Sequence, residues 1–123
     1  MNNPAYRIGT ILYALVIGFF GVNHFMNAPA MSGAVPPYLP ASVIWVYITG
    51  GALVLAAIAI LINYQSKLAG YLLALLLLIF VGTIHVPAFL NAADAGAKAM
   101  AMGSLLKDTG LAAGALMIAG YGR

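Results

Sequence analysis

The sequence predicts an all-α fold, an integral membrane four-helix bundle that forms one domain over residues 1–123. Of the 123 residues, 64% are hydrophobic and only 6% are charged, too few for the surface of a soluble domain. The apolar residues form four continuous runs, each near the roughly 20 residues that a spanning helix needs. The runs lack the alternating apolar and polar residues that are typical of transmembrane β-barrel strands. We therefore expect spans at about residues 8–25, 42–62, 68–90 and 104–121.

The connection after the first run contains four of the six prolines of the chain. Proline fixes its own φ angle and lacks a backbone donor, so residues 27–41 are expected to form a stiff, extended segment that can act as a lid. The turn at residues 63–66 is short, which makes the second and third spans antiparallel neighbours. Both features predict the form of the connections without reference to how the helices pack.

The end of the third run contains Pro87, whose ring crowds the carbonyl of Thr83. A kink or a helix end is therefore expected around His85. Residues 91–103, which follow, are rich in alanine and glycine, and we expect a mobile loop or a short surface helix there.

The fourth run carries a stripe of small and polar residues at helical spacing. Steps of 4, 3, 4, 3 and 4 residues connect Gly103, Lys107, Gly110, Gly114, Met117 and Tyr121. Small residues allow close helix contact, so this stripe is the expected packing face. Lys107 could instead extend outward to the membrane surface. Asp108 is turned by about 100° from Lys107, so each should find its partner elsewhere; alternatively, Asp108 is an exposed carboxylate at the start of its helix.

The charges outside the runs predict an orientation. With four spans, both termini and the turn at 63–66 share one side, which carries Arg7, Lys67 and Arg123 without any acid. The opposite side has two lysines and two aspartates, which cancel. The positive-inside rule therefore places both termini in the cytoplasm.

Four ionisable residues are expected at one depth. His24 and His85 lie 17 and 18 residues after the nearest upstream cation, and Lys107 and Asp108 lie 16 and 15 residues before the last residue. At about 1.5 Å per residue, all four lie about 22 to 27 Å from one boundary of a layer about 30 Å thick. Ionisable groups within membranes are costly and usually functional, so this polar layer is the candidate site.

Further features surround the histidines. Gly21 and Gly82 each precede a histidine by three residues, leaving room for a backbone or a ligand. Aromatic side chains at the same end of the bundle suit either an interfacial belt or a pocket wall. Either histidine alone could instead be a hydrogen-bonded residue at the interface. The candidate ligand-binding residues are His24, His85, Lys107, Asp108, Tyr38, Trp45 and Tyr47.

Several classes of chemistry are excluded or not predicted. The absence of cysteine excludes disulfides, thiol catalysis and iron–sulfur ligation within this chain. No basic patch predicts nucleic-acid binding, and no metal site or catalytic residue is predicted. Any redox role would therefore require a bound cofactor or a partner.

Several of these motifs together resemble a known family. The string Gly21-Val-Asn-His24-Phe25, the proline-rich Val35–Pro40, the pair Gly50-Gly51, His85, and Lys107-Asp108 with Gly110 and Gly114 resemble the DoxX family in order and spacing. The resemblance spans Tyr6 to Gly122. It implies a small four-helix protein of the bacterial cytoplasmic (inner) membrane. Some members resemble small subunits associated with thiosulfate:quinone oxidoreduction, and others are linked to membrane oxidoreductase assemblies.

Three functions remain open. The first is binding of a quinone or similar amphipathic ligand, with a histidine or Lys107 donating to a ring carbonyl and a partner protein supplying electrons. The second, haem held by His24 and His85, is disfavoured because a short bundle hardly encloses the macrocycle. The third is a scaffold or assembly factor that binds partner helices, or further copies of the chain, through glycine-lined faces.

Overall fold

The computed structural model describes residues 3–122, and within them every regular element is helical. The long helices are α1 (Pro4–Met26), α3 (Ser42–Leu61), α4 (Ser66–Phe80) and α6 (Ala95–Tyr121). Shorter elements connect them: α2 (Ala28–Met31), the 3-10 turn η1 (Ser32–Ala34), the π-helical turn η2 (Val81–His85) and α5 (Val86–Leu90). The predicted all-α class is confirmed.

Three helices in the described part of the chain are long and apolar enough to cross a membrane: Pro4–Met26, Ser42–Leu61 and the continuous segment Ser66–Leu90. They overlap the first three predicted spans. The fourth predicted span, 104–121, lies within α6, which is not among these three helices. Lys98, Lys107 and Asp108 reduce the apolar character of α6.

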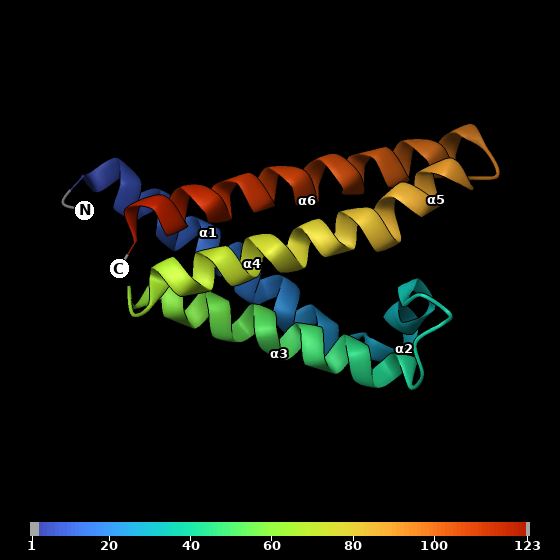
Figure 1. The fold of residues 1–123 in the computed structure, drawn as a ribbon, viewed down its shortest axis with the longest axis horizontal. Helices are drawn as coiled ribbons and strands as arrows, with labels where there is room; N and C mark the ends of the chain where they lie inside the picture. Colours follow the sequence, from blue (N-terminus) through green and yellow to red (C-terminus); the bar gives the residue numbers. More distant parts are fainter. Residues whose placement is uncertain (1–2, 123) are drawn as a thin grey trace.

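The long helices associate as two pairs, α1 with α3 and α4 with α6, and α3 contacts α4. Figure 1 shows both termini and the α3–α4 turn at one end of the molecule, where the pairs lie close together. Toward the other end, which carries α2 and the α5–α6 connection, the two pairs diverge (Figure 1). Buried alanine, leucine and isoleucine side chains form the core, including Ala14, Ile17, Leu53, Ile60, Leu73, Leu77, Ala112 and Ala115.

Glycine permits the closest helix crossings. A Cβ atom on Gly21 would lie 2.9 Å from the Gly50 carbonyl oxygen, and one on Gly50 would lie 2.7 Å from the His24 Cβ. In the other pair, a Cβ on Gly70 would lie 2.7 Å from the Ala115 carbonyl oxygen. The room expected beside Gly21 is therefore occupied by α3, whereas a Cβ on Gly82 would meet no atom within 4 Å.

The predicted packing face of α6 is wrong. Its buried residues are Asp108, Ala112, Ala115, Ile118 and Ala119, whereas most of the glycine-containing stripe is exposed, including Met117 and Tyr121. Only Gly114 of the stripe's glycines has a neighbour, the ring of Tyr13. Both faces of α6 are lined by small residues, and the alanine face is buried because its methyl groups provide apolar contacts that glycine cannot.

Two connections are more helical than expected. Residues 27–41 begin with α2 and η1 and are not extended throughout, because Pro29 lies in the first turn of α2, where its missing N–H costs little. Residues 91–103 are not a mobile loop or a separate surface helix, because α6 begins at Ala95. The Asp94 carboxylate accepts a hydrogen bond from the Ala97 N–H (2.7 Å), and alanine favours helix strongly.

The expected irregularity near Pro87 takes the form of a π-helical turn. The helix changes from α to π at Val81–His85 and continues as α5, with the Val86 N–H donating to the carbonyl of Val81. One extra residue in this turn accommodates the proline without ending the helix. The turn also places His85 where α4 meets the diverging end of the molecule.

Candidate functional site

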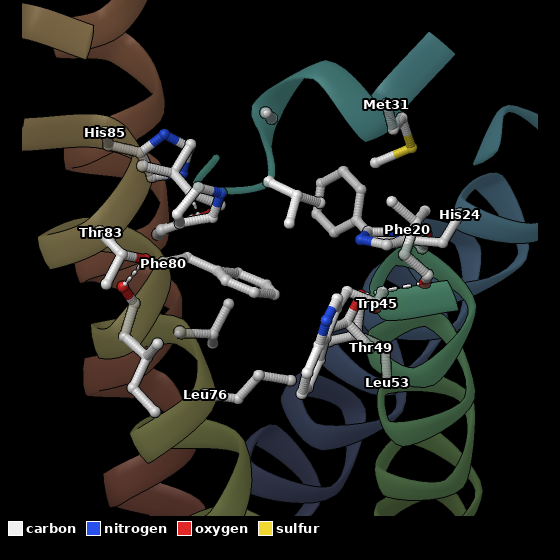
Figure 2. A pocket seen from close by; sticks show the side chains of 18 of the residues that line it. Phe20, His24, Met31, Trp45, Thr49, Leu53, Leu76, Phe80, Thr83 and His85 are labelled. Atoms are coloured by element: carbon white, nitrogen blue, oxygen red, sulfur yellow. Dashed lines mark hydrogen bonds and ion pairs between the residues drawn. The ribbon is translucent and has the colours of Figure 1, made fainter. Parts of the chain in front are cut away.

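A cavity of about 610 Å³ lies between the two helix pairs at their diverging end. α1 and α3 form one wall, α4 and η2 form the opposite wall, and two residues of α6 complete it. Residues from Met31 to Leu39 lie over the cavity, as expected of a lid. Most of the lining is apolar; Figure 2 shows Phe20, Leu53, Leu76, Phe80 and Met31 around the space.

All four residues of the predicted polar layer line this one cavity: His24, His85, Lys107 and Asp108. Figure 2 shows the two histidines on opposite walls, His24 on the α1 side and His85 on the η2 side. The count of helical residues from the charged boundary therefore identified groups that line the same cavity. The splay of the helix pairs provides the space between them.

Asp108 is the most buried of the four, with 5% of its surface exposed. Its carboxylate accepts a hydrogen bond from His85 Nε2 at 2.7 Å. Lys107 Nζ lies 3.6 Å from the other carboxylate oxygen. Each residue has the expected partner on another element, His85 for Asp108 and the Phe20 ring for Lys107, but the expectation that Lys107 and Asp108 do not face one another is wrong. The alternative of an exposed Asp108 carboxylate is also wrong.

Lys107 links α6 to α1 across the cavity. Its Nζ lies 4.7 Å from the centroid of the Phe20 ring, within the range of a cation–π contact. The side chain is 49% exposed, so the ammonium remains accessible. Deeper in the same gap, the hydroxyl of Tyr13 donates to the carbonyl of Leu111. These two contacts connect the helix pairs on the side of α1 and α6.

His24 is held by its own helix. Its Nδ1 forms a 2.7 Å hydrogen bond with the carbonyl of Phe20, one turn earlier. Because a carbonyl only accepts, Nδ1 carries the proton. The two histidines are therefore fixed in different ways, one by a backbone carbonyl and the other by a carboxylate.

The aromatic candidates separate into two groups. Trp45 and Tyr38 line the cavity, and the Trp45 indole donates to the Pro40 carbonyl (2.9 Å), which joins α3 to the lid. Tyr47 does not line the cavity and packs against Phe25, with 5.7 Å between the ring centroids. Trp45 and Tyr47 are two positions apart in the helix, so their side chains point about 200° apart around its axis.

Sequence reasoning missed two aromatic wall residues, Phe20 and Phe80. Phe20 precedes His24 by four residues in an α-helix, and Phe80 precedes His85 by five residues through a π turn. Each phenylalanine therefore lies on the same side of its helix as the following histidine. An aromatic residue one turn before each histidine was the available signal.

The fold and cavity define the class of the protein: within residues 3–122 the regular elements are helical, three helices are long and apolar enough to cross a membrane, and an apolar cavity contains a small polar cluster. The chain belongs to the DUF8561 family, a domain of unknown function, whose family model matches residues 13–119. No curated protein and no solved structure matches the chain.

Proposed function

We propose that this protein binds a small amphipathic ligand of the quinone type within the membrane. The observation that carries the proposal is the cavity of about 610 Å³ that His24, His85, Lys107 and Asp108 all line. Ligand sites commonly have volumes of about 300 to 1,000 Å³, apolar walls and a few polar groups that orient the ligand. This cavity has all three properties.

The polar head of the ligand lies among the two histidines and Lys107, and its apolar tail follows the gap between α3 and α4. Trp45 on α3 and Ile79 on α4 line the cavity and are 38% and 47% exposed, so they border the gap that the proposed tail follows. In a bilayer the outer surface of these helices faces lipid. A ligand dissolved in the membrane can therefore enter from the side.

The wider role that we propose is that of a DoxX-like accessory subunit in a membrane redox assembly. The chain has no cysteine, so electrons come from a partner protein. His85 and Asp108 provide a short path for protons toward the outer water. Haem is a weaker candidate, because ligation through His85 Nε2 would break its hydrogen bond with Asp108.

A second candidate is a scaffold for partner helices or for further copies of the chain. It is favoured by Gly103 and Gly110, which face open space on the outer side of α6. Replacement of both histidines by glutamine discriminates between the two functions. A scaffold retains its assembly and activity, whereas a ligand-binding subunit folds but loses its redox function.

We expect decylubiquinone to quench the fluorescence of the protein in a saturable manner, because Trp45 is the only tryptophan and lines the cavity. His24→Gln and His85→Gln should each weaken the apparent affinity for its reduced form, decylubiquinol, about fivefold to tenfold, the effect of one modest hydrogen bond. Fluorescence titration in lipid nanodiscs measures both effects.

The matched control is Tyr47→Phe, which changes an aromatic residue outside the cavity and should leave the titration unchanged. Quenching that rises linearly with quinone and is identical in all variants reports only partition into lipid. That result would reject the proposed function.

We also propose that all four long helices cross a bacterial cytoplasmic membrane, with both termini in the cytoplasm. The termini and the α3–α4 turn lie at one end of the molecule (Figure 1), together with Arg7 and Lys67. Arg7 anchors this end by donating to the Leu61 carbonyl. Arg123, the third cation on which the predicted orientation depends, lies outside the described residues.

Single cysteines test this topology, because the chain has none of its own. We expect an impermeant maleimide to label Ala99→Cys in intact spheroplasts and to label Gln65→Cys only after lysis. Both positions are exposed, so access depends on the side of the membrane. Labelling of both positions from one side would contradict the proposed topology.

A further inference from the structure

The hydrogens of most polar side chains around the cavity are directed to the protein itself. The Thr83 hydroxyl donates to the Ile79 carbonyl at 2.7 Å, and the Thr49 hydroxyl to the carbonyls of Trp45 and Val46 at 3.0 Å. The Trp45 indole N–H donates to Pro40. These groups present lone pairs or apolar edges to the cavity, and no free hydrogen.

Both histidines present an acceptor nitrogen in the neutral form. His24 carries its proton on Nδ1, where it bonds to the Phe20 carbonyl, so Nε2 has the free lone pair. His85 carries its proton on Nε2, where it bonds to the Asp108 carboxylate, so Nδ1 has the free lone pair. The carbonyl thus fixes the tautomer of His24, and the carboxylate fixes that of His85.

With His85 neutral, the polar cluster is balanced in charge. The Asp108 carboxylate already has a cation, because Lys107 Nζ lies 3.6 Å from its second oxygen. A protonated His85 would add an uncompensated charge to this layer of the membrane, where charges are costly. The neutral cluster therefore consists of one ammonium, one carboxylate and two imidazoles.

The acceptor nitrogens are accessible, and their rings line the cavity. No buried side-chain nitrogen or oxygen lacks a hydrogen-bond partner among the described residues. His24 Nε2 and His85 Nδ1 have no hydrogen-bond partner within residues 3–122, so they are accessible, and both rings line the cavity from opposite walls (Figure 2). A ligand between these walls therefore has an imidazole with an accessible acceptor nitrogen on each side.

We infer that the cavity binds the reduced, dihydroxy form of a quinone-type ligand in preference to the oxidised form. This inference rests on the proposed function and specifies its substrate. A hydroquinone has a hydroxyl on each side of its ring, and each can donate to one histidine. A quinone carbonyl can only accept, so its lone pairs would oppose those of the imidazoles.

The donors that remain do not reverse this preference. Lys107 can donate to a hydroxyl oxygen as well as to a carbonyl, so it holds both forms. Tyr38 is mostly exposed on the lid, and the Asn23 NH₂, like Lys107, can donate to a hydroxyl oxygen as well as to a carbonyl. The two histidines therefore distinguish the forms, and in the proposed arrangement Lys107, not a histidine, donates to a quinone carbonyl.

An anaerobic competition assay tests the inference. Decylubiquinone is bound first, and the recovery of Trp45 fluorescence is followed during addition of decylubiquinol or of its dimethyl ether. We expect the quinol to bind on the order of tenfold more tightly than either the quinone or the ether, from two added hydrogen bonds. The ether retains the ring and tail but cannot donate.

Asp108→Asn provides a second test, because it should reverse the His85 tautomer. Lys107 only donates, so the asparagine turns its oxygen toward Lys107 and its NH₂ toward His85 Nε2. His85 Nδ1 then carries the proton and donates into the cavity. We expect the preference for quinol to fall severalfold, whereas Tyr47→Phe leaves it unchanged.

The possible outcomes distinguish the preference for quinol from the binding of quinone-type ligands in general. Equal or tighter binding of the quinone in the unmodified protein overturns the inference and leaves the proposed function intact. An unchanged preference in folded Asp108→Asn also overturns the role assigned to His85. Failure of both quinone and quinol to bind overturns the proposed function itself.

Discussion

Asp108→Ala is expected to lower the free energy of unfolding by about 2 to 3 kcal/mol, because it removes a buried carboxylate that two partners contact. His85 loses its 2.7 Å hydrogen bond and Lys107 loses its nearest anion. Without the carboxylate, nothing fixes the orientation or tautomer of His85. We therefore also expect affinity for decylubiquinol to fall about tenfold.

The matched control is Asp94→Ala, which removes the other carboxylate of the chain. Asp94 is exposed and caps α6, so its loss should cost about 1 kcal/mol and leave ligand affinity unchanged. Unfolding by a denaturing detergent, followed by circular dichroism, measures stability, and Trp45 quenching measures binding. Equal effects of the two substitutions on binding would show that Asp108 does not organise the site.

The depth of the polar layer could be predicted from the sequence because the rise per residue is constant along an α-helix. Counting from the charged ends placed His24, His85, Lys107 and Asp108 near one level, and the structure brings all four to one cavity. The prediction depends only on helix geometry and on the positions of the cations. It requires no knowledge of which helices are neighbours.

Which face of α6 is buried could not be predicted in the same way. Glycines and alanines both recur on α6 at helical spacing, so periodicity alone gives two candidate packing faces. Which face packs depends on Gly70 of α4, whose missing side chain lets the backbone of Ala115 and Ala119 approach closely. This close approach depends on the residues of both helices, so the sequence of α6 alone does not predict it.

Of the three aromatic candidates, only Tyr47 lies outside the cavity, for a related reason. Trp45 and Tyr47 lie in the same turn of the second span, and composition suits either residue to an interface or a pocket. Only the direction of α3 relative to the lid distinguishes them: Trp45 reaches Pro40, and Tyr47 reaches Phe25. The splay between the helix pairs, which creates the cavity, likewise follows from tertiary packing.

Gly50→Ala is expected to damage both stability and the site, because α1 and α3 cross most closely beside His24. The added methyl would lie 2.7 Å from the His24 Cβ and 3.1 Å from the Gly21 carbonyl oxygen. Neither atom belongs to the flexible end of a side chain, so the two helices must separate. We expect a loss of about 2 kcal/mol in the free energy of unfolding, as for other overpacked contacts.

Two further glycines turn this prediction into a comparison of one substitution at three places. Gly70→Ala meets the Ala115 carbonyl oxygen at 2.7 Å, so it should destabilise the protein similarly, but it lies outside the cavity and the folded fraction should bind quinol normally. Gly110→Ala meets no atom within 4 Å and should stabilise α6 by about 0.5 to 1 kcal/mol. Detergent unfolding and Trp45 quenching of all three variants check this pattern. If Gly50→Ala binds quinol as well as Gly70→Ala does, the α1–α3 crossing does not position His24.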